Sequence, residues 1–297
     1  MPVLDLEDYR IRIDLDQSWY RTKPEDLLTP GNQHELVLKL LEQITGQVPP
    51  DRWETPHRAR RTLYNMLIQA NPGSYSEPEL QAIDQLLWSE KQSESSRQSS
   101  RTHPKLDQRK NKTKLQIWRG DITTLPCDAI VNAANSALLG CFRPDHPCID
   151  NAIHAAAGPR LRDDCAAIMT LQGHPEPTGF AKITRAYNLP CRYVLHTVGP
   201  IHRGDDAIIQ ESHDLANAYL SCLNLAGKIS TIKTLAFCCI STGVFGFPAS
   251  RACQIAIKTV EQWLVNKPNH IQTIIFNVFS VHDEMLYQRM LGNTNDG

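Results

Sequence analysis

From residue 115 onward, short apolar runs alternate with longer stretches whose apolar residues recur at helical spacing. Two runs, LAFCCI at 235–240 and TIIFNVF at 273–279, are almost wholly apolar, as strands are when both faces of a sheet are covered. The expected strands are 115–118, 129–132, 193–197, 234–240 and 273–279, and the expected helices are 149–157, 159–172, 208–226, 249–265 and 283–291. Strands that alternate with helices predict an α/β protein with a mostly parallel sheet.

The first 88 residues show no strand pattern. Segments with helical periodicity are 34–44, 55–70 and the residues that follow the capping-box pair Ser76 and Glu79. The next segment contains one apolar residue, Leu106, and cannot bury enough surface to offset its ordering entropy. We expect a helical N-terminal region at 1–88, a linker or mobile loop at 89–114, and an α/β domain at 115–297.

Composition excludes several classes of protein. The 297 residues are 41% hydrophobic and 21% charged, which is ordinary for a globular chain of one or two domains. A net charge of -1 gives no global attraction to nucleic acid or anionic lipid, so neither partner is expected. No apolar run approaches the ~20 residues of a membrane span, and the N-terminus lacks a secretory signal pattern. Nine cysteines favour free thiols in a reducing compartment, so we expect a cytoplasmic protein.

A soft-metal cluster lies between the expected strand 129–132 and the expected helix 149–157. Cys141, His146 and Cys148 bring two thiols and one imidazole together within eight residues. Zinc takes these ligands readily, and three protein ligands with an open position are typical of a catalytic site. A structural zinc would require a fourth ligand, such as Asp145 or a distant cysteine, and the chain could also bind no metal here. By contrast, we interpret His154 and His196 as packed, hydrogen-bonded histidines.

Two loops at strand-to-helix junctions have features of phosphate-binding loops. The first, STGVFGFP at 241–248, follows an apolar run, and Gly243 and Gly246 permit close backbone approach. The second, at 138–140, leads through the metal cluster to the next helix. Unpaired backbone N–H groups at such junctions bind phosphate oxygens, although a glycine loop is often only a tight turn. Together the loops predict a nucleotide diphosphate ligand.

Six motifs in this order resemble the macrodomain, an α/β/α fold that binds ADP-ribose: WRGDIT, VNAANSALLG, IDNAIHAAAG, TGFAKITRAYNLP, VLHTVGP and ISTGVFGFP. The resemblance covers roughly residues 115–291 and implies three layers with a mixed, mostly parallel sheet. After the NAAN motif most such proteins are glycine-rich, whereas this chain has CFRPDHPC. That departure resembles the zinc-dependent macrodomains, which remove ADP-ribose from modified proteins and also carry a helical N-terminal segment.

The resemblance implies roles along an ADP-ribose cleft. At the adenine end, Asp121 would accept a hydrogen bond from the amino group, Ile122 would supply a backbone contact, and Phe279 or Asn277 would lie nearby. The residues implied for the diphosphate and the adjoining ribose are Ser241, Thr242, Gly243, Val244, Phe245 and Gly246. Phe245 would cover the distal ribose.

The resemblance also implies a reactive end. Asn132, Asn135 and Asp150 would lie near the distal ribose, and Cys141, His146 and Cys148 would hold zinc. We expect Asn135, Asp150 and the three metal ligands to be the catalytic set. Asp150 could act as a general base or bind the ribose, or it could be only a carboxylate favoured by the dipole of its helix.

These expectations favour a hydrolase that cleaves mono-ADP-ribose from protein side chains, with an ester to Asp or Glu as the linkage that the resemblance implies. Its partners would be ADP-ribosylated protein and ADP-ribose, and its cofactor would be Zn²⁺. Two other functions would use the same cleft: a binding module without turnover, or a hydrolase of free O-acetyl-ADP-ribose or ADP-ribose 1''-phosphate. The N-terminal helices could dock a target or only buttress the fold.

Overall fold

The computed structural model describes residues 2–19, 27–47, 55–98, 105–110, 112–267 and 269–292. Its centre is a seven-stranded sheet in the order β1-β2-β7-β6-β3-β5-β4. The strands are β1 (Lys105–Lys110), β2 (Thr113–Arg119), β3 (Ala129–Ala134), β4 (Ala181–Arg185), β5 (Tyr193–Val198), β6 (Thr234–Phe237) and β7 (Thr273–Val278). The five inner strands are parallel, and β1 and β4 pair antiparallel at the two edges.

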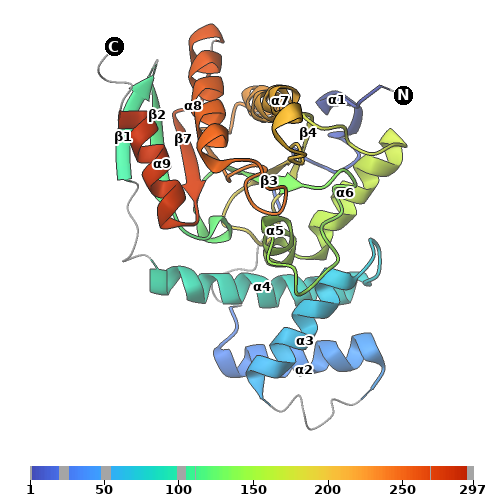
Figure 1. The fold of residues 1–297 in the computed structure, drawn as a ribbon. Helices are drawn as coiled ribbons and strands as arrows, with labels where there is room; N and C mark the ends of the chain where they lie inside the picture. The colour runs from blue at the N-terminus through green and yellow to red at the C-terminus, as the bar shows by residue number, and fades with distance from the viewer. Residues whose placement is uncertain are drawn as a thin grey trace.

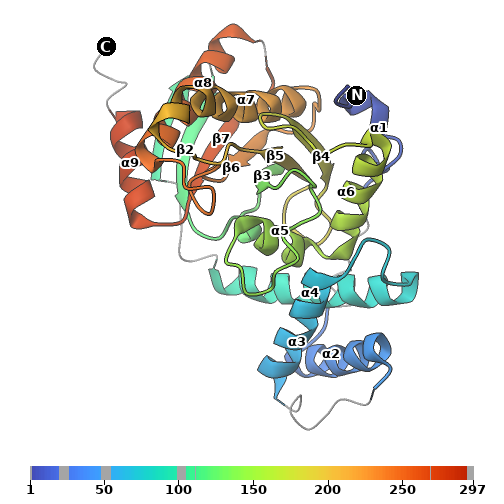
Figure 2. The ribbon, with the colours of Figure 1, turned by 45° about the vertical axis from the view of Figure 1, so that its right-hand side comes forward.

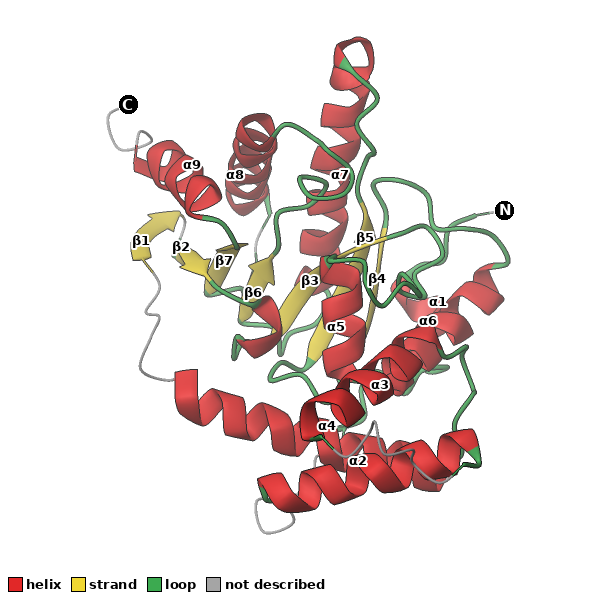
Figure 3. Ribbon diagram, turned by 60° about the horizontal axis from the view of Figure 1, so that its bottom comes forward, coloured by secondary structure: helices red, strands yellow, loops and turns green. Residues whose placement is uncertain are grey.

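The described residues form nine helices, some of which cover the two faces of the sheet. They are α1 (Leu6–Tyr9), α2 (Pro30–Thr45), α3 (Pro56–Gln69), α4 (Glu77–Gln98), α5 (Ile149–Ala157), α6 (Pro159–Gln172), α7 (Ile208–Gly227), α8 (Ala249–Asn266) and α9 (Val281–Gly292), with short 3₁₀ turns η3 (Ile122–Thr124) and η4 (Asp205–Ala207). Helices α7, α8 and α9 lie along one face, and α5 and α6 along the other (Figure 3). The predicted three-layer α/β/α fold with a mixed, mostly parallel sheet is confirmed.

The N-terminal helices α2, α3 and α4 form a further layer beyond α5 and α6 (Figure 1). They share a core of their own, made of Val37, Leu40, Leu41, Ala59, Leu63, Leu67, Ile83, Leu86 and Leu87. These residues recur at three- and four-residue spacing, so each helix buries one apolar stripe against the others. This layer is therefore held together by the hydrophobic periodicity that the sequence shows.

Polar contacts fasten this layer to the α/β body. Arg162 of α6 donates from Nη1 to the carbonyls of Leu67 (2.9 Å) and Ala70 (2.6 Å) at the end of α3. The same guanidinium donates from Nε to the carbonyl of Leu139 (2.8 Å), in the loop that precedes Cys141. Asp84 of α4 accepts from Arg160 Nε at 2.7 Å. The N-terminal layer therefore buttresses the loop that carries the candidate metal ligands.

The first helix belongs to the main core and not to the N-terminal layer. Leu6 and Tyr9 of α1 are buried among residues of the sheet, and the hydroxyl of Tyr9 accepts from the backbone N–H of Ile183 in β4 at 3.0 Å. Figure 2 shows α1 beside α6 and β4. The chain thus crosses the α/β body before it enters α2, and the predicted region 1–88 is not one structural unit.

Two segments differ from the sequence-based expectation. Part of the range 89–114 is regular: α4 continues to Gln98, and 105–110 form the edge strand β1. Backbone pairing with β2 gives β1 its structure, so its polar composition does not prevent a strand. The strand β4 is additional, because Lys182 and Thr184 alternate with Ile183 and obscure its apolar pattern; both polar side chains are buried with partners. In the described part of the chain, no helix is long and apolar enough to span a bilayer.

Candidate active site

A cleft of about 950 Å³ opens at the carboxyl ends of the parallel strands. Strand ends and the residues just after them contribute Gly120, Asp121, Ile122, Ala133, Ala134, Asn135, Gly199, Cys238, Cys239, Asn277 and Phe279. In open α/β sheets this edge is where ligands bind. Of the predicted site residues, all but Asn132 and Gly246 line this main cleft.

At one end of the main cleft, Asp121 lies in the turn that follows β2. Asp121 is the N-cap of the turn η3, and its Oδ1 accepts from the backbone N–H (2.9 Å) and the hydroxyl (2.8 Å) of Thr123. Asn277, at the end of β7, donates to the carbonyl of Gly120 at 2.9 Å and fixes the neighbouring strand end. Phe279 follows with 81% of its surface exposed. An exposed ring at a cleft mouth is available to stack on a planar ligand.

The loop 241–248 lines the middle of the main cleft. It turns sharply because Ser241 and Gly246 both adopt a positive φ of 66°, and Phe247 donates to the carbonyl of Ser241 at 3.0 Å. A Cβ at Gly199 would lie 2.1 Å from the Oγ of Ser241, so the neighbouring strand end must be glycine for this close approach. At Gly243 a Cβ would meet nothing, so this side of the loop faces open space. The loop is therefore a sharp turn at the cleft wall, and its role in phosphate binding stays a prediction.

The three candidate metal ligands come together at the other end of the main cleft. The Sγ of Cys141 lies 3.2 Å from Nδ1 of His146, and the ligand atoms of Cys141, His146 and Cys148 all lie within 4.8 Å of one another. Asn151 holds the loop closed by donating to the carbonyls of Arg143 (2.6 Å) and His146 (3.1 Å). All three ligands are half-buried.

The cluster fits a zinc ion. Zinc bonds of about 2.0–2.3 Å place tetrahedral ligand atoms about 3.3–3.8 Å apart. The 3.2 Å between Cys141 Sγ and His146 Nδ1 is close to this range, and all three ligand atoms lie within 4.8 Å of one another. Burial raises the pKa of the Cys148 thiol to about 11, and a bound cation would favour the thiolate instead. Asp145 does not join the group: its Oδ1 lies 3.3 Å from Nη2 of Arg61, and its side chain is 86% exposed. Among the described residues the loop therefore offers three ligands, and all three line the main cleft.

Asp150 lies one turn further on, in the first turn of α5, and is 4% exposed. Its Oδ1 accepts from Asn132 Nδ2 at 2.8 Å, and its Oδ2 accepts from Asn135 Nδ2 at 3.4 Å. Burial raises the pKa of Asp150 to about 6, and the hydrogen bond from Asn132 lowers it in part. At neutral pH the carboxyl is ionised and able to accept a proton or a hydroxyl hydrogen bond.

Asn132 differs from its expected position at the ligand surface. It is fully buried beneath the main cleft and reaches it only through Asp150. Below it, His196 lies 3.3 Å away through Nδ1, and His196 Nε2 lies 2.9 Å from the hydroxyl of Thr184. Burial lowers the pKa of His196 to about 3, and it holds the pKa of His154 well below its usual range. Both rings are neutral and packed beneath the main cleft. His196 is hydrogen-bonded as predicted, whereas His154 forms no hydrogen bond among the described residues and its Nε2 lies 3.5 Å from Oδ1 of Asp150.

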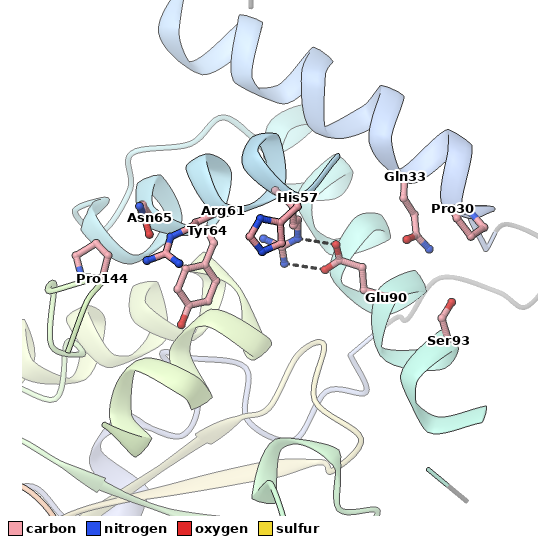
Figure 4. Close-up of a pocket in the computed structure, with 10 residues that line it drawn as sticks. Pro30, Gln33, His57, Arg61, Tyr64, Asn65, Glu90, Ser93 and Pro144 are labelled. Atoms are coloured by element: carbon pink, nitrogen blue, oxygen red, sulfur yellow. Dashed lines mark hydrogen bonds and ion pairs between the residues drawn. The ribbon is translucent and has the colours of Figure 1, made fainter. Parts of the chain in front are cut away.

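Two residues of the main cleft come from α3, in which no functional residue was expected from the sequence. Arg61 and Tyr64 line the cleft beside Pro144 and His146 (Figure 4 shows both side chains leaving α3 toward the α/β body). The basic run HRARR at 57–61 was the available signal, but sequence spacing does not show that α3 packs against α5 and the metal loop.

Comparisons with known proteins agree with this geometry. The Macro domain family matches residues 131–256. A protein of Treponema medium named protein-ADP-ribose hydrolase is 59% identical over 175 residues, which are 59% of this chain and 66% of the relative. A Staphylococcus aureus (strain MSSA476) protein of the same name is 52% identical over 172 residues, 58% of this chain and 64% of the relative. The matches thus span slightly under two thirds of these relatives.

Solved structures of macrodomains are also similar to this chain in their fold. An Oceanobacillus iheyensis macrodomain with MES bound is 36% identical, has a TM-score of 0.59, and covers 66% of this chain and 98% of its own. A Trypanosoma brucei macrodomain in complex with ADP-ribose is 35% identical, has a TM-score of 0.52, and covers 60% of this chain and 69% of its own. With its cleft at the sheet edge and these similarities, the chain belongs to the macrodomain family.

Proposed function

We propose that this protein is a hydrolase that releases mono-ADP-ribose from modified protein side chains, with an ester to Asp or Glu as the linkage. One observation carries the proposal: a buried carboxylate and a three-ligand metal cluster lie in the same macrodomain cleft. Recognition of ADP-ribose alone needs neither group. The names of the similar proteins from Treponema medium and Staphylococcus aureus support the same activity.

ADP-ribose would lie along the main cleft in the order of its parts. Asp121 and Phe279 would contact the adenine, and the backbone N–H groups of the loop 241–246 would contact the diphosphate. The distal ribose would then lie over Asn135 and Asp150. This order places the bond to the modified side chain at the end that contains the metal cluster.

Cleavage at the anomeric carbon passes through an oxocarbenium-like state, so the site must hold the ribose and supply a proton acceptor. Asp150 is ionised above its pKa of about 6 and would either accept the proton of the attacking water or bind a ribose hydroxyl. Asn132 orients this carboxylate from below, and Asn135 holds it from the side while also donating to the carbonyl of Gly140 at 2.9 Å. These contacts fix the carboxylate in one direction.

Cys141, His146 and Cys148 would hold a zinc ion at this end. When bound, it would supply a Lewis acid that orients the ribose hydroxyls and acidifies a neighbouring water. Two thiolates and one neutral imidazole would leave the centre without net charge, so we expect orientation to matter as much as acidification. The nine free cysteines support the further proposal of a reducing, cytoplasmic compartment.

The test compares substrates. The protein is incubated with a mono-ADP-ribosylated protein, with O-acetyl-ADP-ribose and with ADP-ribose 1''-phosphate, and released ADP-ribose is measured by mass spectrometry. We expect the highest kcat/KM on the modified protein and loss of turnover in Asp150→Ala. Tight ADP-ribose binding without turnover of any substrate would identify a binding module instead. Faster turnover of either small molecule would identify a metabolite hydrolase.

A further inference from the structure

A second hollow adjoins the main cleft. This outer hollow has a volume of about 620 Å³ and lies between α2, α3 and α4. Figure 4 shows Pro30 and Gln33 at one end, His57 and Glu90 in the middle, and Pro144 at the other end. Arg61, Tyr64 and Pro144 line both the outer hollow and the main cleft. The two spaces therefore meet at the end where the candidate metal ligands lie.

The wall of the outer hollow that α3 forms is basic. The sequence of α3, PHRARRTLYNMLIQ, contains three arginines and one histidine and no acidic residue. Glu90 on the opposite wall is already bound to Arg60 through two hydrogen bonds, of 2.5 and 2.7 Å. Among the described residues, Arg61 forms one ion pair, the 3.3 Å contact with Asp145, and both side chains are largely exposed. An exposed pair of this kind is weak and is easily exchanged for another carboxylate.

Two further polar groups belong to residues of this wall: the buried Nη1 of Arg60 and the hydroxyl of Tyr64. Nη1 of Arg60 has no hydrogen-bond partner among the described residues, although the other two guanidinium nitrogens bind Glu90. Burial raises the pKa of Tyr64, so its hydroxyl stays protonated at neutral pH and can donate. The exposed, exchangeable ion pair of Arg61 and the donor hydroxyl of Tyr64 fit a ligand that is rich in carboxylates and backbone carbonyls.

We propose that the outer hollow docks an acidic peptide segment that flanks the modified residue of the substrate protein. The inference rests on the proposed hydrolase function, because the polypeptide must leave the main cleft at its metal end. The path past Arg61, Tyr64 and Pro144 leads directly into the outer hollow. The N-terminal layer thus selects protein substrates by charge, in addition to buttressing the metal loop.

The test uses a charge change at the start of α3. His57 lines the outer hollow, and Arg58 is the next residue along α3. Both side chains are exposed, and neither lines the main cleft. The double variant His57→Glu/Arg58→Glu places acidic residues in the first helical turn, where the helix dipole favours them. With Thr55 it also creates the Thr-x-x-Glu pattern of a capping box, so the variant is not expected to unfold. The matched control, Gln254→Glu/Lys258→Glu, makes the same total charge change on exposed positions of α8, away from the N-terminal layer.

Two measurements are made on each protein. The first is kcat/KM for ADP-ribosylated peptides with acidic or neutral flanking residues, and for O-acetyl-ADP-ribose. The second is the affinity for the same two peptides when ADP-ribose is attached through a non-hydrolysable linkage, measured by fluorescence anisotropy. We expect the wild type to prefer the acidic peptide in both, and the α3 variant to lose about tenfold of this preference at low salt. The control variant retains it.

The outcomes separate the two proposals. Equal affinity of the wild type for acidic and neutral peptides would overturn docking in the outer hollow, even if both are hydrolysed. A charge preference in binding that the α3 variant loses, without hydrolysis of any substrate, would support docking and overturn the hydrolase proposal. An equal loss of preference in the α3 variant and in the control would assign the effect to net charge and would also overturn docking.

Discussion

Replacing Asp150 with asparagine should change the pH dependence of folding stability in a defined direction. Burial raises the pKa of Asp150 from 3.8 to about 6, so the folded state holds this proton over a pH range in which the unfolded chain has released it. The stabilisation that comes from binding this proton in the folded state is therefore fully present below pH 3.8 and is lost as pH rises through about 6. A difference of about two pKa units corresponds to about 3 kcal/mol, of which about 2–3 kcal/mol falls between pH 4 and pH 7.

The variant Asp150→Asn lacks this titration. Its stability relative to the wild type should become more favourable by about 2–3 kcal/mol between pH 4 and pH 7. Any pH-independent effect of the new amide, such as an unpaired N–H beside Asn132, cancels in this comparison. The measurement is urea unfolding of both proteins at pH 4, 5, 6 and 7 after metal removal, because a nearby cation would lower the pKa of the carboxyl.

The unfolding measurement needs a control variant, and an activity assay of Asp150→Asn tests the catalytic role of this residue. The control variant is Asp206→Asn, which replaces an exposed carboxylate in η4 and is unfolded with urea under the same conditions. If Asp150 accepts a proton in the reaction, Asp150→Asn lowers kcat by about 10²–10⁴-fold, whereas a role limited to ribose binding raises KM instead. A relative stability that does not change with pH, or that changes in the opposite direction, would refute the reasoning about burial.

Three further changes test other parts of the structure. Chelation should abolish hydrolysis while circular dichroism still shows a folded protein; metal-free protein with full activity would contradict a catalytic metal. Gly199→Ala should destabilise the fold by about 1–3 kcal/mol, because the new Cβ would lie 2.1 Å from Ser241 Oγ. It should also weaken ADP-ribose binding about tenfold, as measured by calorimetry. Unchanged binding would show that the 241–248 loop tolerates displacement. Glu176→Ala should lower the free energy of unfolding, measured with denaturant, by about 3–5 kcal/mol, because it leaves the buried Lys182 ammonium without the carboxylate 2.7 Å away. The double variant Glu176→Leu/Lys182→Met should recover most of the lost stability. Equal losses in the single and double variants would argue against an unpaired charge as the cause.

Most of the sheet could be predicted from the sequence because its inner strands are covered on both faces. The runs that became β3, β5 and β7 are mostly apolar, and short apolar runs between helical segments indicate strands that are buried on both faces. The edge strands β1 and β4 carry no such pattern. Lys182 is buried in β4 only because Glu176, six residues earlier, returns to neutralise it, and this pairing depends on the tertiary fold. Edge strands with polar side chains therefore require three-dimensional information.

The candidate site was predicted where local sequence determines local geometry. Cys141, His146 and Cys148 lie within one loop, so short spacing is enough to bring them together. Arg61 and Tyr64 lie about eighty residues earlier in the chain and reach the main cleft only because α3 packs on α5 and Arg162 fixes its end. We expected Asn132 near the distal ribose, but the register of β3 places its side chain beneath the main cleft, where Nδ2 donates to Oδ1 of Asp150. The roles of these residues in ADP-ribose binding and catalysis stay predictions.

The proposed hydrolysis depends on a divalent metal at the distal-ribose end of the main cleft, with one position open to substrate. The most direct measurement is diffraction from a crystal of the protein with ADP-ribose, recorded on both sides of the zinc absorption edge. We predict one anomalous peak bound by Cys141, His146 and Cys148, adjacent to the distal ribose and to Asp150. The absence of a peak, or an ion with four protein ligands turned away from the ribose, would contradict the account.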